Sequence, residues 1–340
     1  MSFKVTIQPS GRTFTAAEGK SILASADDAG IKLPHACQNG ACGACEGRIL
    51  AGTVDYGEYQ ESLLTEFDKE EGLALFCAAR PLSDLTIEAW EIESETIHDP
   101  VTVNARVARM ERLCHDVMGV WLSLPEGAAF SFLAGQYVDF LLEDGRRRSF
   151  SMANSADGSG QLEFHIRHVP GGYFTERVFN TLKVGDEIGV HGPLGTFFLR
   201  DTNRPALFIA GGTGYAPVKS MVEKALAGGE LKRPMRLYWG ARQSRDLYLA
   251  GQPEAWARAD SNFSFVPVLS EPDGSGWTGR SGLVHEAALA DLANLADWDV
   301  YVCGAPAMVE AARRDFLARG LPREAFHSDA YTYQSTPAQP

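Results

Sequence analysis

Four cysteines near the start of the chain constrain its fold more than any other feature of the sequence. Three of them are spaced as Cys37-x4-Cys42-x2-Cys45, and Cys77 follows after 31 intervening residues. The amino terminus has no basic stretch followed by an apolar core, so we expect no secretory signal and a cytoplasmic location. Disulfides are rare in that reducing compartment, and four clustered thiols there predict a metal site instead.

The spacing of these thiols is the one that holds a [2Fe–2S] cluster in plant-type ferredoxins. The residues between the first three cysteines include Gly40, Ala41, Gly43 and Ala44. Their small size lets the loop wrap an inorganic core and point backbone N–H groups at the sulfurs. A structural zinc site is the alternative, but zinc sites usually pair two C-x2-C units and the fourth cysteine has no such mate. The predicted cluster ligands are Cys37, Cys42, Cys45 and Cys77.

Length and charge limit the classes of protein that remain. The chain has 340 residues, enough for two or three domains, and 45% of them are hydrophobic, as in ordinary globular proteins. No apolar run approaches the roughly 20 residues that cross a bilayer. The net charge is −13, and residues 1–93 hold 15 acidic but 7 basic side chains. This charge excludes phosphate-based binding of nucleic acid and suits docking on a basic partner, with solubility alone as the other explanation.

Changes in hydrophobic pattern divide the chain into three parts. In the first part, strands are predicted at residues 3–7, 48–50 and 85–90, with a helix at 21–29 ended by Gly30. The second part has short strand-like runs, interrupted by one helix near 175–182, and this pattern is typical of a small antiparallel barrel. The predicted strands of this barrel cover residues 101–107, 117–124, 137–142, 162–168 and 187–190.

In the third part, strands alternate with glycine turns and helices. Strands are predicted at 206–209, 237–239, 263–269 and 300–303, and a helix at 217–227. Such alternation indicates a parallel α/β sheet. A polar segment closed by a proline follows Trp90, and the rhythm changes again at Arg204. We therefore predict three domains, comprising residues 1–93, 94–203 and 204–340.

A tetrapeptide in the second domain carries the first resemblance. Arg148-Ser149-Phe150-Ser151 resembles the R-x-[YF]-[ST] motif of the ferredoxin–NADP⁺ reductase superfamily. The resemblance implies that Arg148 meets the flavin pyrophosphate, that Phe150 packs by the flavin, and that the Ser151 hydroxyl lies near the reactive flavin nitrogen. A planar guanidinium suits the phosphate role, because its fork pairs with phosphate oxygens. A solvated basic patch over residues 146–148 is the alternative.

A glycine turn after the 162–168 strand resembles the second flavin-phosphate element of the same superfamily. There a strand ends in a turn that opens a helix, and a helix N-terminus is a ready anion site. The residues of this element are His165, Ile166, Arg167, Val169, Gly171, Gly172 and Thr175.

Two further motifs follow predicted strands of the third domain. The first lacks the G-x-G-x-x-G form but resembles the GGTG[IY]AP element of these reductases, and it contains Gly211, Gly212, Thr213, Gly214 and Pro217. The second resembles the C-G-x-P-x-M element that flanks the nicotinamide, and it contains Cys303, Gly304, Pro306 and Met308. Cys303 is expected at the reacting centre with Ser151, not as a nucleophile, because no histidine is placed to activate it. A small buried hydrophobe is its alternative role.

The order of the motifs extends the resemblance over nearly the whole chain. A plant-type ferredoxin followed by flavin and nicotinamide domains resembles the reductase components of bacterial ring-hydroxylating oxygenases, and equally the CDP-6-deoxy-glucoseen reductase. The resemblance implies a β-grasp ferredoxin domain, an antiparallel β-barrel domain and a parallel-sheet α/β domain. The ferredoxin comes first, which favours FAD over FMN. Many relatives end near the flavin with an E-K-F segment, whereas this chain reads Asp329-Ala330-Tyr331, and the resemblance implies Tyr331 as the aromatic ring over the flavin.

Electron counting sets the expected path. NADH gives two electrons together and a [2Fe–2S] cluster takes one at a time, so a flavin has to stand between them. The acceptor is expected to be an oxygenase component or, alternatively, an iron–sulfur dehydratase of deoxysugar synthesis, and a monomer is expected. A slow redox sensor with the same cofactors is a third hypothesis. NADH is preferred over NADPH here, because Asp246 would repel a 2′-phosphate and accept a ribose hydroxyl, although Arg242 and Arg245 lie close by.

Overall fold

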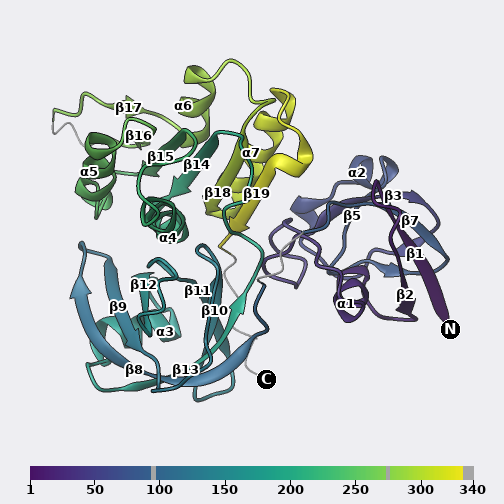
Figure 1. Ribbon diagram of the computed structural model, residues 1–340, viewed down its shortest axis with the longest axis horizontal. Coiled ribbons are helices and arrows are strands. Elements are labelled where there is room, and N and C mark those ends of the chain that lie inside the picture. The colour runs from purple at the N-terminus through teal and green to yellow at the C-terminus, as the bar shows by residue number, and fades with distance from the viewer. Residues whose placement is uncertain (93–96, 273–275, 332–340) are drawn as a thin grey trace. The chain divides into compact units, whose positions relative to one another are not determined.

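The computed structural model describes residues 1–92, 97–272 and 276–331 (Figure 1). Ile97–His327 form one compact unit, and the described residues before and after them, 1–92 and 328–331, belong to another. The predicted boundary between residues 93 and 94 lies outside the described residues. Within the described chain, no helix is both long and apolar enough to cross a membrane.

The first unit is built on a five-stranded sheet with the order β2-β1-β7-β3-β5. β1 pairs in parallel with β7, and the other neighbours are antiparallel. The strands are β1 (Ser2–Gln8), β2 (Thr13–Ala17), β3 (Glu46–Ala51), β5 (Leu73–Leu75) and β7 (Leu85–Glu88), with a separate pair β4 (Val54–Asp55) and β6 (Arg80–Pro81). The strands predicted at 3–7, 48–50 and 85–90 are confirmed as β1, β3 and β7.

Two helices accompany this sheet, α1 (Ile22–Asp28) and α2 (Glu66–Glu70). α1 begins where the Ser21 hydroxyl accepts a hydrogen bond from the Ala24 N–H, and it ends before Gly30, whose φ of +71° suits a glycine. Its apolar side, including Ile22, is buried in one core with Val5 and the sheet. The helix predicted at 21–29 is therefore confirmed.

The first half of the second unit is a six-stranded antiparallel sheet with the order β11-β10-β13-β8-β9-β12. Its strands are β8 (Val101–Arg112), β9 (Val117–Ser123), β10 (Tyr137–Leu141), β11 (Arg147–Ser151), β12 (Gln161–Arg167) and β13 (Glu187–Leu194). The sheet curls, so that Ala153, just after β11, donates its N–H to the backbone carbonyl oxygen of Glu163 in β12 over 2.7 Å. Helix α3 (Tyr173–Asn180) buries Phe174 and Val178 in the core of this barrel-like sheet (Figure 1).

The second half of this unit carries a six-stranded sheet with the order β17-β16-β15-β14-β18-β19, whose last strand continues past His327, where the unit ends. The strands are β14 (Ala206–Gly211), β15 (Met235–Ala241), β16 (Phe263–Leu269), β17 (Arg280–Ser281), β18 (Asp299–Gly304) and β19 (Phe326–Ala330). β14 pairs in parallel with both β15 and β18, and β15 pairs in parallel with β16, as predicted. After β14, the next strands β15, β16 and β17 are added on one side of it, and β18 then pairs with its other side. Strand order therefore reverses between β14 and β18, where α/β proteins usually bind ligands.

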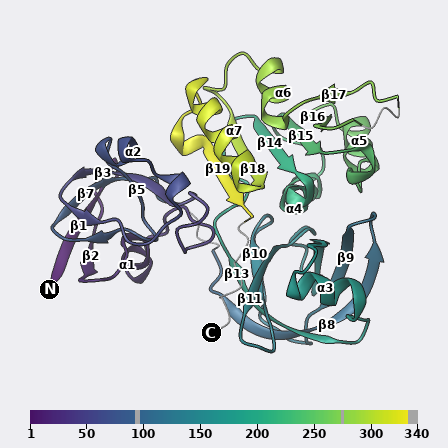
Figure 2. The same cartoon turned by 180° about the vertical axis from the view of Figure 1, so that it is seen from behind.

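Helices cover both faces of the parallel sheet (Figure 2). They are α4 (Tyr215–Leu226), α5 (Gly251–Ala259), α6 (Val284–Asp291) and α7 (Pro306–Ala318). α6 contacts α7, and α4 contacts both β14 and β18. The helix predicted at 217–227 is confirmed as α4, and it begins two residues earlier, directly after a short 3-10 turn over Gly212–Gly214.

Candidate functional site

The loop before β3 brings the four predicted cluster cysteines together. Their thiols form two pairs, Cys37 with Cys42 and Cys45 with Cys77. Backbone N–H groups of the loop point at the sulfurs, from Gly40 to Cys77 Sγ over 3.3 Å and from Ala41 to Cys37 Sγ over 3.4 Å. Four thiols gathered at one loop, with N–H groups directed at the sulfurs, fit a 2Fe-2S cluster that these four cysteines would hold.

Hydrogen bonds within each pair shift the pKa values of the two thiols in opposite directions. The Cys42 thiol donates to Cys37 and, helped by backbone N–H groups, lowers the pKa of Cys37 to about 6 although burial opposes the shift. The same bond and burial raise the pKa of Cys42. Gly40 has a φ of +74°, and a Cβ there would lie 2.7 Å from the Glu58 carbonyl oxygen. The loop is thus drawn tightly around its sulfurs, and the residues present fit a cluster.

The two thiol pairs lead to a prediction about the iron, sulfide and flavin content of the purified protein. The purified protein is expected to hold about two irons with acid-labile sulfide and one flavin, and to be yellow-brown. Metal and sulfide analysis checks this, with Cys114→Ser as a control variant, because Cys114 lies in the other unit. One zinc per chain without labile sulfide would contradict the assignment.

β11 carries the predicted flavin motif, and its side chains alternate between two faces. Phe150 packs against Phe140 and Phe174, with ring centroids 5.0 and 5.6 Å apart. Ser149 donates its hydroxyl to Asp139 Oδ1 over 2.7 Å. Ser151, at the end of the strand, is buried. The motif is therefore spread over both faces of the strand.

Positive charge is concentrated at the start of β11. Arg146 binds Asp144 over 2.7 Å, and Arg147 lies 3.8 Å from Asp139. Burial, and then the charge of Arg146, lower the pKa of Arg148. A crowded, partly desolvated guanidinium is stabilised by an anion, so the residues present fit a flavin pyrophosphate.

The glycine turn before α3 gathers four of the seven residues predicted for the second flavin element. The Thr175 hydroxyl accepts from the Val169 N–H over 3.1 Å and donates to the Val169 carbonyl over 3.0 Å. Gly171 has a φ of +74°, and its N–H donates to Glu176 Oε1 over 3.0 Å. A Cβ on Gly172 would lie 2.6 Å from Thr175 Oγ1. The turn is therefore closed tightly on itself.

The other three residues of that element lie in β12, and their side chains lead elsewhere. Ile166 is buried in the barrel core. The His165 ring is fully buried between Glu163 and Tyr248. Arg167 binds Asp116, with Nε 3.1 Å from Oδ2, and its Nη1 would lie 2.7 Å from a Cβ on Gly212. The side chain of Arg167 thus lies against the loop of the nicotinamide half.

The two predicted nicotinamide motifs meet at the ends of neighbouring strands. Ala210 of β14 pairs in register with Cys303 of β18, so the loops that follow lie side by side. A Cβ on Gly214 would lie 2.1 Å from the Cys303 carbonyl oxygen, and one on Gly211 would lie 2.6 Å from Met308 Sδ. Gly304, with a φ of +155°, lies against Gly211. Only glycines allow this contact, which lies at the reversal of strand order.

The remaining members of these motifs lie in the adjoining turns. Thr213 is in the 3-10 turn, Pro217 is buried in the first turn of α4, and Pro306 is the first residue of α7. Cys303 is fully buried. The sequence did not indicate Trp239, whose Nε1–H donates to the Gly212 carbonyl over 2.9 Å and holds the loop.

Asp246 and Tyr331 are placed differently from the motif residues. Asp246 is buried, and its Oδ2 accepts from the Gln243 N–H over 3.0 Å, capping a 3-10 turn. Its Oδ1 lies 3.8 Å from His115 Nδ1. Tyr331 is half-buried directly after β19, and its role beside the flavin stays a prediction.

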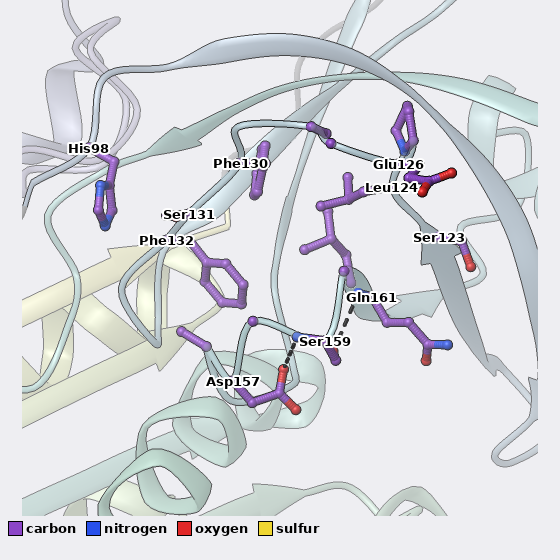
Figure 3. A pocket seen from close by; sticks show the side chains of 17 residues that line it. His98, Ser123, Leu124, Glu126, Phe130, Ser131, Phe132, Asp157, Ser159 and Gln161 are labelled. Carbon is purple, nitrogen blue, oxygen red and sulfur yellow. Dashed lines mark hydrogen bonds between the residues drawn. The ribbon is translucent and has the colours of Figure 1, made fainter.

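A separate pocket lies on the barrel, away from these motifs (Figure 3). It has a volume of about 770 Å³ and is lined by the segments around Phe130 and Phe132 and around Asp157 and Ser159. In the lining loop that contains Asp157 and Ser159, the Ser159 N–H donates a hydrogen bond to Asp157 Oδ1 over 2.9 Å. Among the described lining residues, none belongs to the predicted sites.

Comparison with known proteins assigns each part of the chain to a domain family. Residues 5–82 match the 2Fe-2S iron-sulfur cluster binding domain, 104–199 the oxidoreductase FAD-binding domain, and 208–314 the oxidoreductase NAD-binding domain. The three matches follow the order that the motifs predicted.

Full-length relatives share this order. The chain is 39% identical over 331 residues to the CDP-6-deoxy-L-threo-D-glycero-4-hexulose-3-dehydrase reductase of Yersinia pestis, covering 97% of this chain and 99% of that one. It is 36% identical over 340 residues to the phenol 2-monooxygenase reductase component of Pseudomonas sp. (strain CF600), covering 98% and 95%. The crystal structure of the Amycolatopsis cytochrome P450 reductase superposes with a TM-score of 0.72 at 34% identity, covering 96% and 98%.

Together, the fold, the converging motifs and the relatives establish the class of activity. The chain is an NAD(P)H-dependent flavin and iron–sulfur oxidoreductase that carries electrons from the nicotinamide through FAD to a 2Fe-2S cluster. It belongs to the family of electron-donating reductases in which a 2Fe-2S ferredoxin domain is joined to FAD-binding and NAD-binding oxidoreductase domains.

Proposed function

We propose that the electron acceptor of this reductase is a terminal oxygenase component. Relatives that cover the whole chain are named as reductases of a phenol monooxygenase and of a cytochrome P450, which supports this acceptor class. An iron–sulfur dehydratase acting on a deoxyhexulose is the second candidate, favoured by the 39% identity to a dehydrase reductase. We propose that the chain works as a monomer, because one chain carries all three cofactor domains. We also propose a cytoplasmic location, because free cysteines fit a reducing compartment.

The observation that carries the docking proposal is the acidic surface of the ferredoxin domain. Glu58 and Glu61 are exposed just before α2, and Glu66, Glu70 and Glu71 are exposed on the helix or at its end. Lys69 offsets part of this charge, because its Nζ lies 2.8 Å from Glu66 Oε1. Such a surface steers a partner with a basic face and repels an acidic one.

Each part of the chain has a distinct task in this function. Bound flavin can take two electrons as a hydride and give them up singly, which is the chemistry the polypeptide lacks. The β11 arginines and the turn before α3 would hold its phosphates, and Ser151 would place a hydroxyl near its reactive nitrogen. The glycine contact between Gly211 and Gly304 would let a dinucleotide approach the backbone. The four cysteines would hold the cluster.

Raising the salt concentration is expected to slow electron delivery to the acceptor protein. Between about 0.01 M and 0.1 M ionic strength the Debye length falls from about 30 Å to about 10 Å, which weakens steering by exposed charge. The measurement is NADH-driven turnover of a purified oxygenase component, and in parallel of a sugar dehydratase, at both ionic strengths. Ferricyanide, a small acceptor, serves as the control for the reductase itself.

The outcomes of this experiment separate the candidates. Faster, salt-sensitive turnover of the oxygenase supports the first proposal, and faster turnover of the dehydratase supports the second. A protein-coupled rate that does not respond to salt would mean that the acidic surface serves solubility alone. Turnover of neither acceptor, with ferricyanide reduced normally, would contradict both.

We propose that NADH is used in preference to NADPH. The Asp246 carboxylate lies in the 3-10 turn that follows β15, in the same segment as the exposed Arg242 and Arg245, and a carboxylate there disfavours a 2′-phosphate. The kcat/KM for NADH is expected to exceed that for NADPH. Asp246→Ala is expected to bring the two kcat/KM values closer together. A clear preference for NADPH that disappears in Arg242→Ala or Arg245→Ala would overturn the proposal.

A further inference from the structure

β12 is buried on both of its faces, and the two faces differ in chemistry. Leu162, Phe164 and Ile166 point into the barrel core. Glu163 and His165 alternate with them on the opposite face, and both are buried. A strand with alternating apolar and ionisable residues would ordinarily turn the ionisable face to water. Here helix α4 of the nicotinamide half covers that face.

Lys219 of α4 is the main partner of this face. Its Nζ lies 2.9 Å from Glu163 Oε2 and 3.1 Å from the Ala153 carbonyl oxygen. Glu223, one turn further along α4, lies 3.0 Å from the same ammonium. Lys219 is 5% exposed, so its charge is removed from water and is compensated by these three oxygens.

His165 continues the network from the other oxygen of the carboxylate. Its Nε2 lies 2.9 Å from Glu163 Oε1, and its Nδ1 lies 3.0 Å from the Tyr248 hydroxyl. Burial lowers the pKa of His165, so the ring is neutral at pH 7. For Glu163, burial alone would raise the pKa, but the His165 hydrogen bond and the Lys219 charge lower it to about 2. A neutral ring then donates from Nε2 to the carboxylate and accepts at Nδ1 from the tyrosine O–H.

The far end of the network lies against the nicotinamide loop. Tyr248 meets Trp239 edge to face, with ring centroids 5.1 Å apart. Tyr215 stacks on the same indole at 4.0 Å. Trp239 in turn donates its Nε1–H to the Gly212 carbonyl over 2.9 Å. A continuous series of contacts therefore runs from the flavin-binding barrel to the glycine loop.

We propose that Lys219, Glu163, His165 and Tyr248 are positioning residues. They fix the glycine loop at residues 211–214 relative to β12 of the flavin-binding barrel. Hydride transfer needs the two rings at close range, and a shift of about 1 Å in such a contact can cost about a hundredfold in rate. The Lys219–Glu163 ion pair and the two hydrogen bonds of the His165 ring are all formed in only one relative position of α4 and β12. Apolar side chains alone would allow small shifts between the two elements. The network thus selects one placement of the loop.

Lys219→Met tests the proposal, because it removes the ammonium and keeps the length of the side chain. The limiting rate of flavin reduction by NADH, measured anaerobically by stopped flow, is expected to fall by about tenfold or more. The dissociation constant of NADH, flavin content and iron content are expected to stay near the wild-type values. Lys219→Arg, which keeps the charge, is expected to recover most of the rate.

Lys224→Met is the matched control. Lys224 is an exposed lysine on the same helix, and its Nζ contacts the Ala156 carbonyl oxygen over 3.3 Å. It is expected to leave the limiting rate unchanged. Tyr248→Phe removes a single hydroxyl and is expected to fold normally, with a smaller fall in the same rate constant.

A second measurement does not depend on turnover. Amide hydrogen exchange at residues 211–214 of the flavin-free protein is expected to quicken in Lys219→Met and to stay unchanged in Lys224→Met. The proposal is overturned if Lys219→Met and Tyr248→Phe lower thermal stability but leave the limiting rate and the exchange of the loop as in the wild type. It is also overturned if they weaken NADH binding without changing the limiting rate.

Discussion

Replacing Cys42 with serine is expected to reduce NADH-dependent cytochrome c reduction to background while NADH–ferricyanide reduction continues. Cys42 is buried, and its thiol is paired with Cys37. Replacing this thiol with a hydroxyl removes one of the four soft sulfur ligands expected for the cluster. The flavin and nicotinamide domains lie in the other compact unit and keep their own cores. Both activities are measured on the same preparation, with iron and flavin content.

The control for this variant is Cys114→Ser, because that cysteine is half-buried in the hairpin between β8 and β9, far along the chain from the cluster loop. It is expected to keep both activities. Simultaneous loss of ferricyanide and cytochrome c reduction in Cys42→Ser, with flavin still bound, would contradict a path in which the cluster stands last.

Gly214→Ala is expected to have the second largest effect. Its Cβ would lie 2.1 Å from the Cys303 carbonyl oxygen and 2.6 Å from the carbonyl carbon, and a backbone contact of this kind requires the loop after β14 to move away from β18. Overpacking of this sort typically costs about 1–3 kcal/mol of unfolding free energy. Displacing the loop is expected to lower NADH-dependent flavin reduction by about tenfold or more.

Gly228→Ala provides the comparison within the same domain. The nearest atom to its Cβ would be the Ala225 carbonyl oxygen at 3.6 Å, which is an ordinary contact. Melting temperature and flavin reduction by NADH are expected to match the wild type in this variant. Equal behaviour of the two alanine variants would show that the contact between the loops is not needed for dinucleotide use.

The sequence predicted those site residues whose chemistry depends on local spacing. The cysteine loop could be recognised because ligands and small residues lie within one short segment. The meeting of the Gly211 and Cys303 motifs could be expected because both follow strands of one parallel sheet, and the carboxyl ends of such strands share an edge. Side-chain identity and position along the chain were sufficient in both cases.

Residues that act through tertiary contacts were harder to predict. His165 was grouped with the glycine turn because it precedes it, but alternation along β12 turns its ring toward Tyr248, more than eighty positions away. Glu163 and Lys219 carried no motif, although the run Leu162-Glu163-Phe164-His165-Ile166-Arg167 already showed a face of ionisable residues. The sequence placed Asp246 soon after β15, but it did not predict that the Asp246 carboxylate accepts a hydrogen bond from the Gln243 N–H and caps a 3-10 turn. What covers a polar face depends on the whole fold.

The position of β18 beside β14 has a consequence for how the protein is made. The two strands pair directly, yet about 90 residues separate Ala210 from Cys303. Domains form during synthesis from the amino terminus onward. The ferredoxin domain and the barrel strands are therefore made while the dinucleotide edge still lacks β18. A nascent chain of this length has the glycine loop after β14 but not the backbone of Cys303 and Gly304 against which that loop packs.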